Sequence, residues 1–368
     1  MSNSSENDSN DLFPQLGERQ QVIFEATLED FEEYLRNEGK NPRKKKGYAE
    51  RSTEVRKSRV LQVFKRIWET EGVTTDITTQ QADRVIEALD TDEIRRRDGD
   101  RYAESSKRKI SNALVNWFEF TGTDWEPKIK FSDELSENGA DPFNKREVNA
   151  LWEESLTYKS IPKYSDVSPD ERDRWQRYLA QELGIPKEDV RPRDWDRVNK
   201  NWKYPSLIGT VKSAGWRPAL IGRMKVHWYD PDSQNIIIPG EHAVKNDTQW
   251  TQVLPAKAAR PLEMWIEQRE NISKYDDTDH MWLTRKGKPY SSQTLNYFLN
   301  NLMEEAEINQ RGRKLCWYSF RHSIGTYVYE EHKDLKIVAD TLRQNSTESA
   351  SRYVHPTDEL INNAVSIL

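Results

Sequence analysis

The stretch Trp317-Tyr318-Ser319-Phe320-Arg321-His322-Ser323-Ile324-Gly325-Thr326 decides the fold of the carboxyl-terminal part of the chain. Apolar side chains recur here at helical spacing, which predicts a helix from Ser319 to about Glu331 with one apolar stripe. The residues of that stripe are Phe320, Ile324, Tyr327 and Val328. Arg321 falls in the first turn of the predicted helix, beside His322.

Two shorter helices are predicted after this one. Asp334 is placed to cap a helix over residues 335–342, because Leu335, Val338, Ala339 and Leu342 form one apolar face. Ser346 stands where it would cap a third, short helix that carries Tyr353. A cation at one end of a hydrophobic scaffold and a tyrosine at the other suit chemistry on a phosphate.

These residues resemble the catalytic motif of the tyrosine recombinases, also called the phage integrase family. That family carries His-x-x-Arg-His, later a Leu-Gly-His, and later the nucleophilic tyrosine. Arg321 matches the motif arginine, and Tyr353 matches the nucleophile at a separation of 32 residues (353 − 321 = 32). Tyr318 stands where the first histidine is usual, and Gln344 where a histidine or tryptophan is usual. Both substitutes can hydrogen-bond, so the resemblance implies that they orient the phosphate.

A second box of the family occurs upstream, at Gly215-Trp216-Arg217-Pro218-Ala219-Leu220-Ile221. It resembles the first arginine box, usually Gly-Leu-Arg followed by a helix, and the resemblance assigns Arg217 to that arginine. Gly215 suits the left-handed position after a helix, and Pro218 suits the first position of the next one.

Three short strands are predicted next, at residues 224–228, 235–239 and 248–254, separated by polar turns. Lys245 lies in the turn between the second and third strands. In the resembled family, a β-hairpin lysine at this place reaches the DNA and protonates the leaving oxygen. The alternative for Lys245 is an ordinary exposed turn lysine.

The net charge of the chain allows DNA binding only through local clusters of basic residues. With 368 residues the chain is long enough for two domains, and 32% of its residues are charged. The formal net charge of −6 is not that of a typical nucleic-acid binder, so basic runs on an acidic body would have to bind DNA. For any single run, a solvated charged face is the alternative. The candidate DNA-binding residues are Arg43, Lys44, Lys45, Lys46, Arg51, Arg56, Lys107, Arg108 and Lys109.

Composition also bears on the compartment. The acidic excess suits a salt-rich cytoplasm such as that of a salt-loving archaeon, so the family member expected is of archaeal or archaeal-virus type. The single cysteine, Cys316, excludes an internal disulfide and a cysteine-based metal cluster. No apolar run approaches the ~20 residues of a membrane span. We therefore expect a cytoplasmic, nucleoid-associated protein, or one in the host cytoplasm if it is viral, with no membrane partner.

The expected fold is mainly α with a small antiparallel β-sheet. Residues 1–20 are expected to be a disordered tail, and 21–128 a bundle of four amphipathic helices. The predicted helices are centred on 28–35, begin at Ser52, cover 82–89, and begin at Ser105 or Ser106. The resemblance implies that this bundle is the core-binding domain that clasps DNA, although any small helical domain would share its periodicity. Residues 129–368 would be the catalytic domain, with an unassigned insertion near 158–204.

The resemblance implies a site-specific recombinase or integrase of a virus or mobile element. Arg217 and Arg321 would hold the scissile phosphate without a metal or cofactor. Tyr353 would attack phosphorus and form a 3′-phosphotyrosyl bond, while Lys245 donates a proton to the departing 5′ oxygen.

The expected partner is double-stranded DNA, bound by a homotetramer on two sites that assembles from monomers or dimers. Two alternatives remain open at this point. One is a DNA-binding protein on the same fold that no longer cleaves, which the residues Tyr318 and Gln344 motivate. The other is a type IB topoisomerase-like enzyme, which shares the chemistry but works as a monomer.

Overall fold

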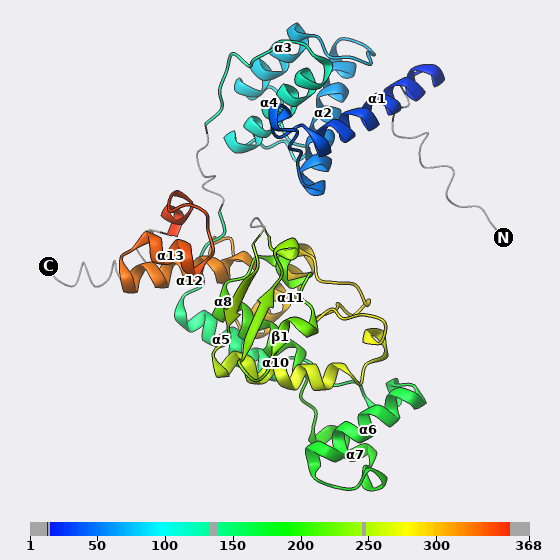
Figure 1. The fold of residues 1–368 in the computed structure, drawn as a ribbon, viewed down its shortest axis with the longest axis vertical. Helices are drawn as coiled ribbons and strands as arrows, with labels where there is room; N and C mark the ends of the chain where they lie inside the picture. Colours follow the sequence, from blue (N-terminus) through cyan, green and yellow to red (C-terminus); the bar gives the residue numbers. More distant parts are fainter. Residues whose placement is uncertain (1–12, 14, 133–138, 245–247, 354–368) are drawn as a thin grey trace, which may run out of the picture. The chain divides into compact units, whose positions relative to one another are not determined.

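The computed structural model describes residues 13, 15–132, 139–244 and 248–353, and the chain folds as two compact units, residues 1–139 and 140–368 (Figure 1). The division lies later in the chain than the boundary predicted between residues 128 and 129. Across the described ranges, no helix is both long and apolar enough to cross a bilayer.

The first unit contains the four predicted helices. They are α1 (Glu18–Asn37), α2 (Glu50–Thr70), α3 (Thr79–Asp90) and α4 (Glu104–Thr121), with a 3₁₀ turn η1 (Pro42–Lys44) after α1. Their apolar faces meet in a core of stacked aromatic rings. The rings of Phe24 and Phe64 pack edge to face with 4.8 Å between their centroids, and those of Phe64 and Trp117 do so with 5.2 Å between theirs.

The amino-terminal ends of these helices differ slightly from the prediction. Helix α2 begins at Glu50, because the Ala49 carbonyl accepts the first helical hydrogen bond, and Ser52 lies inside the helix instead of capping it. Phe13 and Leu16 fall in the predicted tail, yet both are buried. Their apolar side chains extend the packed part of the unit to before residue 21.

The second unit is α+β. Its elements are α5 (Lys145–Thr157), η2 (Tyr164–Asp166), α6 (Pro169–Leu183), η3 (Lys187–Asp189), α7 (Pro192–Arg197), α8 (Lys203–Ala214), α9 (Pro218–Ile221), η4 (Val226–Trp228), β1 (Tyr229–Asp230), β2 (Asn235–Ile238), η5 (Gly240–His242), β3 (Trp250–Val253), α10 (Ala256–Arg269), η6 (Ser273–Tyr275), α11 (Ser292–Glu305), α12 (Tyr318–His332), α13 (Leu335–Thr341) and η7 (Glu348–Tyr353).

The three strands form an antiparallel sheet in the order β1-β2-β3, with Ile238 opposite Trp250. Residues 224–228 were predicted as a strand, and this prediction is wrong. The Val226 N–H donates to the Asp279 carbonyl, and the Met224 carbonyl accepts from Met281. The stretch therefore pairs with a distant loop, and β1 starts only at Tyr229.

Helix α8 is the centre of the second core. Residues 205–211 of this helix are all buried, because α5, α10 and α12 pack around it. Gly209 faces α5, where a β-carbon would lie 3.2 Å from the Trp152 ring, which is tighter than an ordinary contact. The helix ends at Gly215, whose φ of +58° is the left-handed conformation expected from the sequence.

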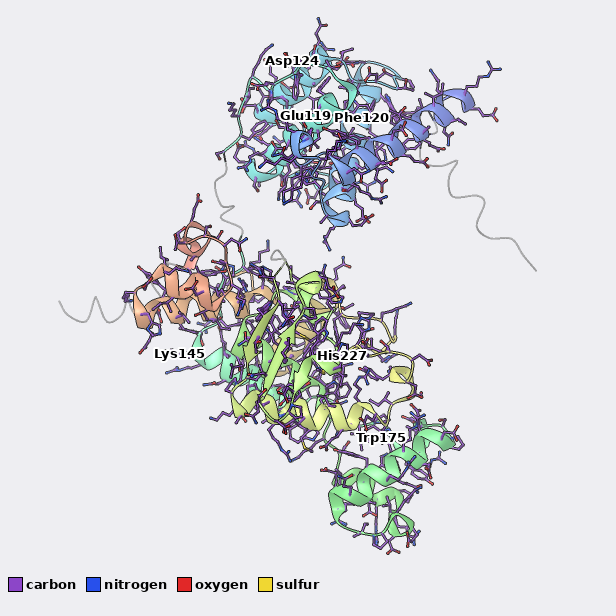
Figure 2. The ribbon with its side chains drawn as sticks, viewed as in Figure 1. Glu119, Phe120, Asp124, Lys145, Trp175 and His227 are labelled. Atoms are coloured by element: carbon purple, nitrogen blue, oxygen red, sulfur yellow. The ribbon has the colours of Figure 1, made fainter. Side chains whose placement is uncertain are left out.

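The predicted insertion, residues 158–204, has a small core of its own. Trp175 on α6 lies in it (Figure 2), together with Tyr178 and Trp195. The Tyr178 hydroxyl accepts a hydrogen bond from Gln268 of α10. This segment is therefore a folded subdomain attached to the rest of the second unit.

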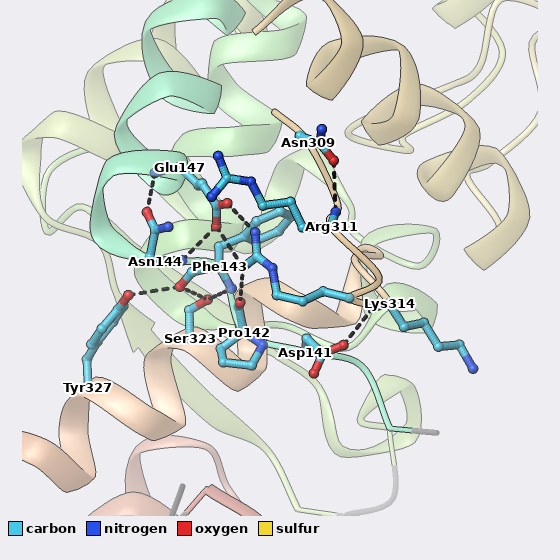
Figure 3. Close-up of polar contacts among 11 residues, drawn as sticks. Asp141, Pro142, Phe143, Asn144, Glu147, Asn309, Arg311, Lys314, Ser323 and Tyr327 are labelled. Carbon is cyan, nitrogen blue, oxygen red and sulfur yellow. Dashed lines mark hydrogen bonds and ion pairs between the residues drawn. The ribbon is translucent and has the colours of Figure 1, made fainter. Parts of the chain in front are cut away.

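The start of the second unit holds α12 in place (Figure 3). The Phe143 N–H donates to the Ser323 hydroxyl at 2.8 Å, and the Phe143 carbonyl accepts from the Tyr327 hydroxyl at 2.8 Å. Arg313 forms an ion pair with Glu147, whose side chain also caps α5. These contacts fix the helix that carries Arg321.

Candidate active site

Arg321 joins three segments of the catalytic unit. It lies in the first turn of α12 and is only 3% exposed. Its Nη1 donates to the Gly215 carbonyl at 3.0 Å, and its Nη2 donates to the Leu342 carbonyl. Its Nε is buried and has no hydrogen-bond partner among the described residues. The guanidinium is thus fixed between the ends of α8 and α13 and keeps one donor unused.

Arg217 lies close to Arg321. It is the residue before α9, and Pro218 opens that helix as predicted. Its Nη1 donates to the Val244 carbonyl at 3.2 Å. Burial lowers the pKa of Arg217, and the Arg321 charge lowers it further, while Tyr318 and Tyr353 oppose the shift. The two arginines and two tyrosines singled out in the sequence therefore lie within electrostatic reach of one another.

A pocket opens beside the two guanidiniums. Arg217, Arg321 and Arg343 line it, together with the indoles of Trp216 and Trp250. No carboxylate is present among the described residues that line it. Three cations and no anion make this pocket a site for a negatively charged group such as a phosphate.

Tyr353 lies beside this pocket but does not line it. Its side chain is 0% exposed on η7, and its ring rests directly against Gly325 of α12. The His322 ring lies 5.1 Å from it, centroid to centroid. Gln344 Nε2 donates to the Tyr353 hydroxyl at 3.1 Å. In this position the phenol is shielded from the pocket by its burial.

The remaining predicted catalytic residues are placed as follows. Tyr318 lies within electrostatic reach of Arg217, and its ring packs edge to face against His322 with 5.3 Å between the ring centroids. Gln344 contacts the phenol through its amide nitrogen, and its buried Oε1 has no hydrogen-bond partner in the described part of the chain. Lys245 lies outside the described residues. Among the residues that are described, no group of three or more His, Cys, Asp or Glu side chains is placed to hold a metal ion.

Most of the predicted DNA-binding cations are on the surface of the first unit. The exposed ones are Arg43, Lys44, Lys45, Lys46, Arg51 and Lys109, while Arg108 is half-buried. The basic run 43–46 is held in a defined turn, because Asn41 caps η1 and Lys45 adopts a left-handed φ of 46°.

Two of the predicted cations are engaged inside the fold. Lys107 is 5% exposed and forms ion pairs with Asp92 at 2.9 Å and Glu104 at 3.0 Å. Arg56 stacks on the Tyr48 ring at 3.5 Å, and its Nε donates to Asn116. The structure therefore does not present Lys107 to solvent and gives Arg56 a structural role.

Residues 198–359 match the phage integrase family, and this range contains Arg217, Arg321, Gln344 and Tyr353. The matched range lies within the second unit. The arginines and the tyrosine that meet beside the pocket are therefore contributed by one recognised domain.

Curated relatives match this chain only in part. Transposase B from transposon Tn554 of Staphylococcus aureus is 25% identical over 114 residues, which cover 30% of this chain and 18% of the transposase. Tyrosine recombinase XerC of Treponema denticola is 25% identical over 96 residues, covering 26% of this chain and 30% of XerC. The matched region spans less than a third of the length of either relative.

Solved structures of tyrosine recombinases resemble the chain over nearly its whole length. XerH recombinase bound to a palindromic difH substrate in a post-cleavage complex gives a TM-score of 0.56 at 16% identity, covering 96% of this chain and 90% of XerH. A lambda integrase dimer bound to a COC′ core site gives 0.50 at 12% identity, covering 90% and 95%. The predicted fold class is confirmed.

Sequence reasoning did not single out three residues that the structure brings to the site. Arg343 takes the place of glycine in the family's Leu-Gly-His pattern, which is the signal that could have revealed it. Trp250 stacks on Arg343, and only the tertiary fold brings these two residues together. The Tyr353 ring packs directly against Gly325. In the sequence, only the small size of this residue, one helical turn after Arg321, pointed to that contact.

Proposed function

We propose that the chain is a site-specific DNA recombinase or integrase that cuts and rejoins DNA through a 3′-phosphotyrosyl intermediate. The observation that supports this best is the pocket in which Arg217 and Arg321 meet, with the Tyr353 phenol sheltered beside it. Paired guanidiniums beside a pocket and a nearby hydroxyl nucleophile are the requirements for metal-free transfer of a phosphodiester.

The chemistry follows from charge. A phosphodiester repels nucleophiles, and attack places further negative charge on its non-bridging oxygens. Arg217 and Arg321 offset that charge in fixed positions. A phenol ordinarily has a pKa of about 10, so the Tyr353 oxygen needs this cationic surrounding to react as phenolate.

In the cleavage step the Tyr353 oxygen bonds to phosphorus, and the bond from phosphorus to the 5′ oxygen breaks. A proton must reach that 5′ oxygen, and we assign its donation to Lys245. Tyr318 lies beside Arg217, and Gln344 holds the phenol until it is released. The phosphotyrosyl bond keeps the energy of the broken bond, so a 5′ hydroxyl from a partner duplex can reverse the step without ATP.

We further propose that the first unit is the core-binding domain and that its exposed basic turn, residues 43–46, contacts the DNA backbone. Strand exchange between two sites needs four active sites, which implies a homotetramer formed from monomers or dimers. The net charge of −6 suits a salt-rich archaeal cytoplasm, and a virus or other mobile element fits a recombinase of this kind. We expect the protein to be associated with the nucleoid.

Covalent capture on DNA tests the proposal. The substrate is a duplex carrying the direct repeat that flanks the element in its genome, nicked next to the cleavage position so that the cut fragment diffuses away. The wild-type protein should give a band on a denaturing gel that carries both protein and labelled DNA. Tyr353→Phe should lose the band and keep its affinity for DNA, whereas a band that persists would exclude Tyr353 as the nucleophile.

A DNA-binding protein that does not cleave is the second candidate, favoured by the complete burial of the Tyr353 ring. It predicts tight binding of the duplex by the wild-type protein with no covalent band. A topoisomerase-like enzyme would instead relax supercoiled plasmid as a monomer, without sequence preference.

A further inference from the structure

Arg343 adopts a backbone conformation that costs free energy. It follows α13 with a φ of +50°, in the left-handed region. A residue with a β-carbon is strained in this conformation, and glycine avoids the strain. Seven other non-glycine residues in the described part of the chain share a positive φ, so the conformation alone assigns no role, and the contacts of the side chain decide it.

The side chain of Arg343 reaches from α13 to the sheet. Its guanidinium carbon lies 4.4 Å from the centroid of the Trp250 ring on β3, which is a cation–π contact. Both Arg343 and Trp250 line the pocket that contains Arg217 and Arg321. The stacking therefore holds a third guanidinium at the wall of the candidate phosphate site.

The backbone on either side of Arg343 is tied to the two central residues of the site. The carbonyl of the preceding residue, Leu342, accepts from Arg321. The following residue, Gln344, donates its backbone N–H to Ala339 and its side-chain amide to the Tyr353 hydroxyl. Arg343 is thus positioned by the same turn that links the arginine and the nucleophile.

The charge balance of the pocket points to an anion held by all three arginines. The charges of Arg217 and Arg321 lie close enough to repel, and a bound anion would offset that repulsion. The two family positions where histidines are usual hold Tyr318 and Gln344, which are uncharged at neutral pH. Arginine is the side chain best suited to offer planar, paired donors to a phosphate.

We propose that Arg343 is a third phosphate-binding arginine, which holds a non-bridging oxygen of the scissile phosphate together with Arg217 and Arg321. This inference rests on the proposed recombinase function. Arg343 then supplies positive charge to the transition state that the uncharged Tyr318 and Gln344 do not supply.

The test compares two arginines in the same backbone conformation. Arg343→Gly removes the cation and relieves the strained φ, so the variant should fold at least as well as the wild type. Arg311→Gly is the matched control, because Arg311 is exposed, has a φ of +49°, and does not line the pocket. At saturating protein, Arg343→Gly should form the covalent complex about 10- to 100-fold more slowly, and Arg311→Gly within about twofold of wild type.

A substrate with an uncharged scissile phosphate then tests whether Arg343 contacts that phosphate. Replacing the scissile phosphate by a methylphosphonate removes the charge on which Arg343 is proposed to act, so the penalty of Arg343→Gly should shrink to about threefold or less. A penalty that stays the same would place Arg343 on another phosphate and overturn the assignment. Equal rates for wild type and Arg343→Gly on the natural substrate would overturn it as well, while leaving the recombinase proposal intact.

DNA binding keeps the inference testable even if the wild-type protein does not cleave, an outcome that would contradict the recombinase proposal. One lost phosphate contact lowers the slope of log affinity against log salt by about 0.9. Arg343→Gly should show that reduction on the uncut duplex, and Arg311→Gly should not. An unchanged slope would mean that Arg343 does not touch the DNA backbone.

Discussion

The packing of the Tyr353 ring can be disturbed by one added methyl group, in the variant Gly325→Ala. A β-carbon on Gly325 would lie 2.6 Å from Cγ of the Tyr353 ring and 2.8 and 2.9 Å from the two Cδ atoms. Ordinary contacts of this kind begin at 3.4 Å, so the ring would have to retreat by about 0.8 Å (3.4 − 2.6). Tyr353 is fully buried against Val338, Ala339 and Ala350, which leaves little room to tilt.

The size of the effect follows from the cost of overpacking. Inserting a methyl into a packed site typically costs about 1–3 kcal/mol. Here the added methyl group destabilises only the state in which the Tyr353 ring packs against residue 325. It does not destabilise a state in which the phenol has moved away. The balance should therefore move toward release by about 5- to 150-fold, at 1.4 kcal/mol for each factor of ten. Because the buried phenol does not line the pocket, we expect Gly325→Ala to form the covalent complex faster than the wild type.

The assay is a quenched time course of covalent complex on the nicked duplex, with DNA affinity measured separately. Gly209→Ala is the matched control. It adds a methyl to a buried glycine of α8, 3.2 Å from the Trp152 ring and away from Tyr353. Both variants should melt a few degrees lower, and only Gly325→Ala should change the cleavage rate. Slower cleavage by a Gly325→Ala protein that still folds and binds DNA would mean that Tyr353 attacks from its buried position.

Three further predictions concern other residues of the catalytic unit. Arg217→Ala should slow cleavage by about 10²–10³-fold with little loss of melting temperature. Arg321→Ala should lower both the cleavage rate and the melting temperature, because it also leaves the Gly215 and Leu342 carbonyls without their donor. Equal melting temperatures for the two variants would contradict this. Tyr318→His should retain measurable cleavage, since a histidine can also hydrogen-bond, and a misfolded product by circular dichroism would show that Tyr318 is needed for packing. Burial lowers the pKa of Lys203 to about 7, so the folded protein binds that proton less tightly than the unfolded chain. The free energy of unfolding should therefore rise with pH between about 7 and 10, by up to about 1.4 kcal/mol per pH unit. Urea unfolding of Lys203→Met should lack this rise, and an identical pH profile would place the titration elsewhere.

The parts of the site that depend on local sequence were predictable. Gly215, Arg217 and Pro218 form a helix end, an arginine and a helix start within four residues, and their conformations depend on near neighbours. The Asp334 cap of α13 is equally local, because its carboxylate accepts from the N–H of Lys336. Order along the chain, together with the family resemblance, then predicted which arginines would meet.

Features that depend on distant partners were not predictable. Lys107 belongs to a basic run, yet its ion pairs with Asp92 and Glu104 draw it into the fold. The stretch 224–228 has the apolar content of a strand, but its hydrogen bonds go to the loop 279–281. The burial of Tyr353 depends on a glycine 28 residues earlier (353 − 325 = 28), and no periodicity reports such a contact.

The position of the covalent bond tests the central claim most directly. The denatured adduct from the nicked substrate is digested with nuclease and protease, and the peptide that carries the remaining nucleotide is sequenced by mass spectrometry. Our account predicts one modified residue, Tyr353, attached through its phenolic oxygen to a 3′ phosphate. Attachment at any other residue, or to a 5′ phosphate, would contradict it.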